Sequence, residues 1–155
     1  MGKLVWHEYA RFTALTASIY AVWAGFWGLF YRKFFWDFIG GILRNPGGLQ
    51  PSPKFAVFIM LIVKFPIIQS VAILLGFWII ALEFPFLPLG SSRIYRSLAL
   101  RIVLLVFQVA LNILYYQGTN AAIWSLIAAV CYARAVALGE KMAQEKENRA
   151  KDGGV

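Results

Sequence analysis

The sequence has few of the residues from which metal centres, disulfides and catalytic clusters are built. It contains one cysteine (Cys131), one histidine (His7) and seven carboxylate side chains among its 155 residues. A lone cysteine cannot form an internal disulfide, a zinc site needs three or four suitable ligands, and a haem inside a membrane needs axial ligands, usually His. No Gly-rich phosphate loop and no Ser-His-Asp set is present. We therefore expect no metal, no cofactor, no small-molecule substrate and no enzymatic activity.

Charge is also scarce, at 14% of the residues, and three long runs contain almost none. An uncharged run of about 18 residues or more is long enough to cross a bilayer as a helix. The last run has 32 residues, which is too many for one crossing, and a polar break at residues 117–120 divides it into a hairpin. The sequence thus predicts an all-α polytopic membrane protein, a four-transmembrane-helix bundle. Its spans are expected at about residues 12–31, 60–82, 98–116 and 119–138.

The abundant residues support the same class. The chain is 61% hydrophobic and 17% aromatic, with a mean hydropathy of +0.68. Its net charge of +8 comes from Lys and Arg residues that flank the spans, so they are expected to set topology and contact lipid headgroups rather than bind nucleic acid. Ten of them lie on the side of the termini and four in the loop 32–54, which predicts that both termini are cytoplasmic. Whether the membrane is the plasma membrane or an ER or Golgi endomembrane stays open.

The segments outside the spans are short. The loop 32–54 is expected to be an ordered cap on the non-cytoplasmic side or a plain membrane-hugging linker, with Trp36 in an interfacial aromatic cluster. Residues 141–155 are expected to form a short charged cytoplasmic tail.

The second apolar run is too long for one straight helix. Its 28 residues, 55–82, would reach roughly 42 Å, against about 30 Å of hydrocarbon. Pro66 removes a backbone donor, so we expect a kink there, with residues 55–63 as a bent extension packed on the first loop. Lys64 is expected at the interface, its side chain reaching toward the headgroups; the alternative is a buried, functional lysine.

Two groups of polar residues are expected to hold helices together. Glu83 closes the second span, and the nearby arginines offer it ion pairs: Arg96, Arg101 and Arg134. Gln108 and Asn112 are spaced i, i+4 on one helix face, which predicts an interhelical hydrogen bond.

Small residues recur at every fourth position in the first and fourth spans. This spacing lets helix backbones approach closely within a membrane. In the first span they are Ala17, Ala21 and Gly25, and in the fourth they include Ala121, Ser125, Ala129 and Ala133. One interpretation is that the two helices pack on each other. The other, which we predict for the fourth span, is a contact for a partner's helix.

Several short motifs resemble a known family. They are Met1-Gly2-Lys3-Leu4-Val5-Trp6, Leu82-Glu83-Phe84-Pro85, Tyr95-Arg96 and Gly139-Glu140, with two closely joined spans between the last two. In this order they resemble the light chain of the NADPH-oxidase cytochrome b, a four-helix membrane subunit without its own haem that stabilises a catalytic partner. The Glu-aromatic-Pro ending is also similar to that of small Golgi and vesicle four-helix proteins, and the chain looks like uncharacterised small fungal membrane proteins. The proline-rich tail of the light-chain family is missing here.

The resemblance and the scarcity of chemical groups predict one function above others. We expect a non-enzymatic accessory subunit that binds and stabilises or regulates a larger integral membrane protein, with membrane lipids as its other partners. The alternatives are a small Golgi or vesicle membrane protein that acts in trafficking and a channel-like oligomer.

Overall fold

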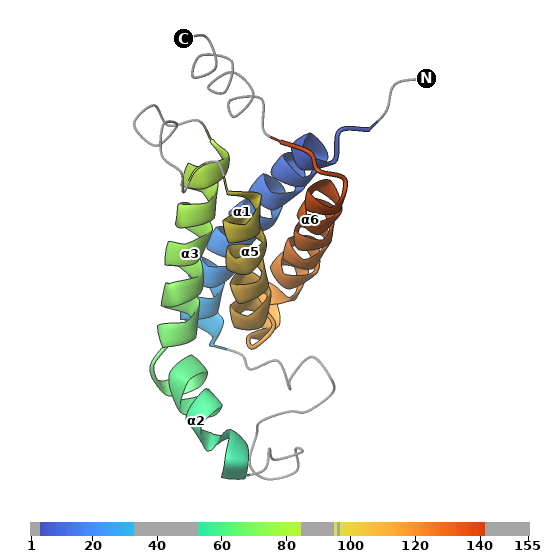
Figure 1. Cartoon of the computed structure of the whole chain (residues 1–155). Helices are drawn as coiled ribbons and strands as arrows, with labels where there is room; N and C mark the ends of the chain where they lie inside the picture. Colours follow the sequence, from blue (N-terminus) through green and yellow to red (C-terminus); the bar gives the residue numbers. More distant parts are fainter. Residues whose placement is uncertain (1–3, 33–52, 85–94, 96, 142–155) are drawn as a thin grey trace.

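Four long helices lie side by side in the computed structural model, which describes residues 4–32, 53–84, 95 and 97–141. They are α1 (Trp6–Tyr31), α3 (Ile67–Glu83), α5 (Leu98–Asn112) and α6 (Thr119–Ala137), and the short α2 (Ala56–Ile59) projects from one end (Figure 1). No strand occurs among these residues, so the predicted all-α fold is confirmed.

Two of the helical stretches are long and apolar enough to cross a membrane, namely Trp6–Tyr31 and Tyr116–Ala137. A third candidate is a bent pair, Pro53–Lys64 and Ile67–Glu83, whose two parts differ in direction by 66°. α5 is apolar but has only 15 residues, about 22 Å of helix, because it ends at Asn112 rather than at the predicted residue 116. By length and composition the protein therefore has two helices, or three with the bent pair, that could span a bilayer.

Side-chain size separates the inner face of the bundle from the outer face. Every buried residue of α1 is small, whereas its large aromatic residues, such as Trp23 (63% exposed) and Phe30 (79% exposed), point outward. This distribution would leave a very large apolar surface in water, but it suits lipid, where small residues permit close helix contacts. The buried residues of α1 are Ala10, Thr13, Ala14, Ala17, Ser18, Ala21, Ala24, Gly25 and Gly28.

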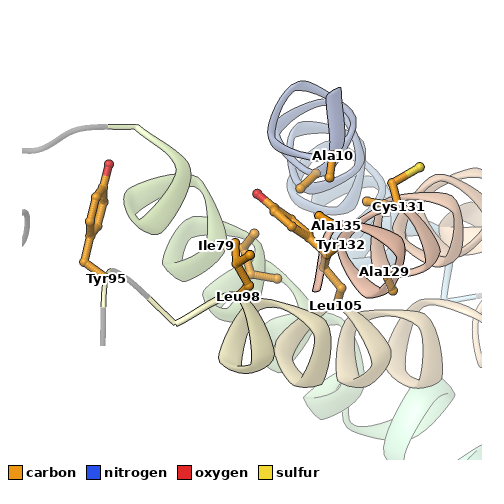
Figure 2. Packing of buried hydrophobic residues seen from close by; sticks show 11 residues of the cluster. Ala10, Ile79, Tyr95, Leu98, Leu105, Ala129, Cys131, Tyr132 and Ala135 are labelled. Carbon is orange, nitrogen blue, oxygen red and sulfur yellow. The ribbon is translucent and has the colours of Figure 1, made fainter. Parts of the chain in front are cut away.

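α1 occupies the centre of the packing because it contacts both α6 and α3, and α5 fills the remaining side against α6. The small residues Ala17, Ala21 and Gly25 all lie inside, so the predicted packing of the first helix against the fourth is confirmed. Gly25 also permits close approach to α3, since a Cβ there would collide with Cγ1 of Ile73. Figure 2 shows how Tyr132 and Leu105 fill the space that the alanines leave between the helices.

The predicted kink at Pro66 is present, and it is a complete break. Residues Met60–Lys64 form a π-helical turn that ends with a hydrogen bond from Phe65 N to Met60 O (2.8 Å), and α3 begins at Ile67. Residues 60–64, with which the predicted second span begins, therefore lie in the segment before the bend, and the straight part of that span starts at Ile67.

The turn between α5 and α6 requires a glycine. The helix α5 ends at Asn112, a 3₁₀ turn covers Tyr116–Gly118, and α6 begins at Thr119, within the predicted polar break. A Cβ on Gly118 would lie 2.8 Å from Cζ of Tyr115 and even closer to the carbonyl oxygen of Asn112. The turn is thus closed by direct packing of its backbone on the end of α5.

Candidate functional site

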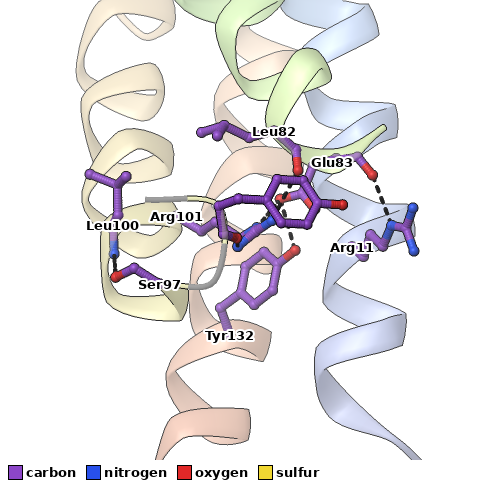
Figure 3. Close-up of polar contacts among 8 residues, drawn as sticks. Arg11, Leu82, Glu83, Ser97, Leu100, Arg101 and Tyr132 are labelled. Carbon is purple, nitrogen blue, oxygen red and sulfur yellow. Dashed lines mark hydrogen bonds and ion pairs between the residues drawn. The ribbon is translucent and has the colours of Figure 1, made fainter. Parts of the chain in front are cut away.

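A buried carboxylate lies where the ends of four helices meet. Glu83, at the end of α3, is only 1% exposed. Its Oε1 accepts hydrogen bonds from Nε of Arg101 on α5 (3.1 Å) and from the hydroxyl of Tyr132 on α6 (2.8 Å). Figure 3 shows these groups converging, together with Arg11 of α1, whose Nε donates to the backbone carbonyl of Glu83 (2.9 Å). We call these four residues, Arg11, Glu83, Arg101 and Tyr132, the carboxylate cluster.

Arg101 is itself buried, at 2% exposed, and uses its whole guanidinium group. Besides Glu83 it donates through Nη1 to the carbonyl of Tyr95 and through Nη2 to the carbonyl of Leu82 (2.9 Å). The last carbonyls of a helix have no partner within that helix, so Arg11 and Arg101 satisfy the end of α3. The guanidinium also lies over the Tyr95 ring, 5.2 Å from its centroid.

Of the two described arginines predicted to pair with Glu83, Arg101 does so and Arg134 does not. The ion pair with Arg101 is present at 3.1 Å with both side chains buried. The prediction for Arg134 is wrong, because its guanidinium stacks over the ring of Trp6 at 4.6 Å and its side chain is exposed. Arg96 lies outside the described residues. Arg134 follows Tyr132 by two positions on α6, so the helical turn directs the two side chains to different faces.

The second carboxylate oxygen of Glu83 is a buried acceptor without a donor among the residues that the structure describes. A buried acceptor with no partner is costly, so the net stabilisation that the ion pair provides is reduced. Within the described ranges, no three His, Cys, Asp or Glu side chains come together. The cluster is thus an arrangement of one carboxylate with two cations and a phenol, whose contacts join α1, α3, α5 and α6.

A second polar layer lies in the middle of the bundle. Nε2 of Gln108 donates to the hydroxyls of Ser125 on α6 (2.8 Å) and Ser18 on α1 (3.3 Å). The predicted interhelical hydrogen bond is therefore confirmed for Gln108. Asn112 acts differently, since it donates to the backbone of its own helix and accepts from the hydroxyl of Tyr115, and so it stabilises the turn.

The small residues of α6 face this interior. Ala121 and Ser125 are fully buried and Ala129 is 4% exposed. The predicted partner contact is wrong for these three, because they already pack against helices of the same chain. Ala133 differs, for it lies on the surface. The spacing of four residues drifts around an α-helix by about 40° per step, which carries the later members of the series out of the core.

A third contact joins the beginning of α1 to the chain just after α6. The carboxylate of Glu140 accepts from the backbone N–H groups of Trp6 (3.1 Å) and His7 (2.9 Å), and from Nδ1 of His7 (2.8 Å). Val5, at the N-cap position of α1, makes no side-chain capping bond, so Glu140 serves as the cap from 134 residues away. We call these three residues, Trp6, His7 and Glu140, the terminal clasp.

The terminal clasp favours the charged form of Glu140. Desolvation alone would raise the pKa of this carboxyl, but the hydrogen bonds from His7 and Trp6 outweigh it and hold the pKa below its ordinary value. A deprotonated carboxylate only accepts, so the ring of His7 must donate from Nδ1. Sequence reasoning missed this contact. The only available signal was that no Ser, Thr, Asp or Asn precedes α1 as a local cap, which leaves the first N–H groups of the helix to a distant acceptor.

Of the two residues predicted to lie at the membrane interface, the structure describes only Lys64. Lys64 is exposed rather than buried inside the bundle, and its backbone carbonyl accepts a hydrogen bond from Nη1 of Arg32 at 3.4 Å. Trp36 lies outside the described residues.

The comparisons with known proteins give one family. A family model described as Domain of unknown function (DUF7727) matches residues 1–140, which include all the described helices and the terminal clasp. No curated protein and no solved structure matches the chain.

Proposed function

The chain belongs to the DUF7727 family, and we propose that it is a non-enzymatic accessory subunit that binds and stabilises a larger integral membrane protein. One observation carries the proposal: polar side chains inside the bundle bond to one another across helices, as in Glu83–Arg101, Glu83–Tyr132 and Gln108–Ser125, while large apolar side chains cover the outside. A bundle with this arrangement offers its outer surface, rather than its interior, to other molecules. The resemblance to the cytochrome b light chain supports the same role.

We further propose that α1, α3, α5 and α6 all cross the membrane, with both termini in the cytoplasm. The terminal clasp supports this topology, because it joins the start of α1 to the end of α6 at one end of the bundle (Figure 1). An even number of crossings follows if both helices span. The excess of Lys and Arg near the termini then favours the cytoplasmic side for this end.

The exposed small residue Ala133 marks the surface where a partner's helix fits best. It lies on α6 between larger exposed residues, Val130 (60% exposed) and Val136 (47% exposed), so a helix can approach its backbone closely. Leucine at this position would hold the approaching helix away without touching the core of the bundle.

The experiment is purification in mild detergent of the wild type and of two variants, followed by quantitative mass spectrometry. The proposal expects a large integral membrane protein in a fixed ratio to the wild type, lost with Ala133→Leu and kept with the control Val71→Leu, at an exposed position on α3. Both variants should unfold at the wild-type temperature, since both positions are exposed.

Other outcomes would overturn the proposal. Recovery of coat or sorting factors in place of a membrane partner would favour the trafficking alternative, and a self-oligomer alone would favour the channel-like one. A large partner retained equally by both variants would refute the assignment of its contact to Ala133.

A further inference from the structure

The segment Pro53–Lys64, which we call the arm, leaves the bundle (Figure 1). Apolar side chains are exposed over most of its length. From Pro53 to Met60 no residue is buried, and Val57 is 58% exposed. Phe55 and Phe58 lie three residues apart with ring centroids separated by 6.5 Å. Nine consecutive residues, 55–63, are apolar. Exposing such an apolar surface to water is energetically unfavourable.

The length of α3 determines the depth in the membrane at which the arm begins. Its 17 residues make about 25 Å of helix, close to the thickness of the hydrocarbon layer. With Glu83 at one interface, Lys64 falls at the other. The contact between Nη1 of Arg32 and the Lys64 carbonyl puts the end of α1 at the same level, where Trp27 and Tyr31 stack with centroids 5.8 Å apart. Trp and Tyr are the residues that favour such an interface.

The direction of the arm follows from the bend. Its axis differs from that of α3 by 66°, so it lies within about 24° of the membrane plane (90° minus 66°) when α3 follows the bilayer normal. The bend is built in, because Pro66 cannot donate to Ile62 and the amide of Gln69 takes that place at 2.9 Å. The arm is therefore not a straight continuation of the span.

We propose that the arm lies in the lipid bilayer itself, just below the headgroups and along the membrane plane, on the side opposite the termini. Its exposed apolar side chains, which include Phe55, Val57 and Met60, contact acyl chains. The lysines at its two ends, Lys54 and Lys64, reach up to bind lipid phosphates, and Arg32 adds a third cation at the bend. The occupant of this surface is thus anionic lipid rather than a protein.

The depth of the arm can be measured with spin labels. Single cysteines replace Ala56, Val57, Ile59 and Met60 in turn, in a Cys131→Ala background, and the full-length protein is reconstituted into phosphatidylcholine–phosphatidylserine vesicles. Accessibility to oxygen and to a water-soluble nickel complex gives the depth of each label. Labels at Val71, Leu74 and Trp78, exposed positions of α3, provide a ruler within the same protein, because depth there changes by about 1.5 Å per residue.

The proposal expects all four arm labels to be accessible to oxygen and to lie at a shallow depth in the bilayer. Differences in depth among them should follow only the face of the helix on which each label lies. A depth that changes along the arm as it does along α3 would show a continuous or re-entrant span. High access to nickel would place the arm in water, and low access to both reagents would place it against protein. Each of these three results would overturn the proposal. Lys54→Gln combined with Lys64→Gln should shift the labels deeper, and no shift would refute the lysine–phosphate contacts.

Discussion

Gln69 donates from Nε2 to the backbone carbonyl of Ile62 at 2.9 Å, and this carbonyl is the one that Pro66 leaves without its helical donor. The side chain of Gln69 is fully buried, and its Oε1 has no partner among the described residues. Reversing the amide would place that oxygen against two carbonyls, those of Ile62 and Gly28, so the observed orientation is the favourable one. A glutamine inside an apolar helix is therefore explained by a proline three residues earlier.

Replacing Gln69 with Leu should lower the free energy of unfolding by about 1–3 kcal/mol, because the buried carbonyl of Ile62 loses its donor. The control is Ser70→Ala, which removes an exposed hydroxyl bonded to Pro66 O and should change stability by about 0.5 kcal/mol or less. Thermal unfolding in detergent gives both values. Equal effects of the two variants would show that the break is stable without Gln69.

The carboxylate cluster should behave as a coupled unit. Arg101→Gln leaves the buried Glu83 carboxyl group without its cation, with Tyr132 as its only side-chain donor among the described residues, and should cost about 3–5 kcal/mol. Glu83→Gln combined with Arg101→Gln should cost less than the sum of the single losses, since neither buried charge then remains unpaired.

Arg134 provides the matched control for this cycle. It stacks on Trp6 and does not contact Glu83, so the losses from Glu83→Gln and Arg134→Gln should add. Stability in detergent is the measurement for all variants. Additive losses for the Glu83 and Arg101 pair would contradict the buried ion pair.

The terminal clasp should make stability depend on acidity. Because the folded-state pKa of Glu140 lies below its ordinary value of 4.5, the clasp contributes fully above that pH. The contribution is lost as the pH falls through the folded-state pKa. We expect Glu140→Gln to lower the free energy of unfolding near neutral pH by about 1 kcal/mol, as the loss of a helix cap does. At acidic pH the wild type loses the same contribution, so the difference in stability between the two proteins should become smaller.

The measurement is the unfolding temperature of both proteins across this pH range. Glu8→Gln is the control, because Glu8 lies in the same first turn of α1 but is exposed and makes none of the clasp contacts. A wild-type advantage over Glu140→Gln that persists undiminished at acidic pH would refute the role of the carboxylate charge.

Gly118→Ala should destabilise the α5–α6 hairpin by overpacking, at about 1–3 kcal/mol. The added Cβ would collide with the Asn112 carbonyl oxygen, and backbone cannot move aside as a flexible side chain can. Ala122→Gly nearby removes a buried methyl group and adds no contact, so it is the comparison in which side-chain volume decreases instead of increasing. Proton NMR or circular dichroism during thermal unfolding would report both. An unchanged midpoint for Gly118→Ala would contradict the close packing of this turn.

The sequence was sufficient to predict the helices, the kink at Pro66 and the bond made by Gln108. It did not show which face of each helix points inward, because in α1 and α6 every face is apolar and hydropathy does not distinguish lipid from core. Residue size does distinguish them, since in these two helices the serines, the glycines and all the alanines but Ala133 and Ala137 face inward. Applied to α6, this rule would have placed Ala121, Ser125 and Ala129 inside.

The contacts that sequence reasoning missed join residues far apart in the chain. Tyr132 reaches Glu83 across 49 positions, and Glu140 reaches Trp6 across 134. No local pattern encodes such pairs, because they depend on how the helices cross. The sequence suggested three arginines for Glu83, whereas the geometry of α6 directs Arg134 to Trp6 instead.

The proposed function depends most on the membrane topology, with an even number of crossings and both termini in the cytoplasm. The direct measurement is labelling of single cysteines with an impermeant reagent on intact cells, in a Cys131→Ala background. Gly48→Cys lies in the loop before the arm, and Gly2→Cys and Gly153→Cys report the two termini. If the protein is in the plasma membrane, only Gly48→Cys should be labelled on intact cells. If it is in an endomembrane, permeabilising the plasma membrane alone should expose both termini and leave Gly48→Cys protected. Labelling that puts either terminus on the same side of the membrane as Gly48→Cys would contradict the topology.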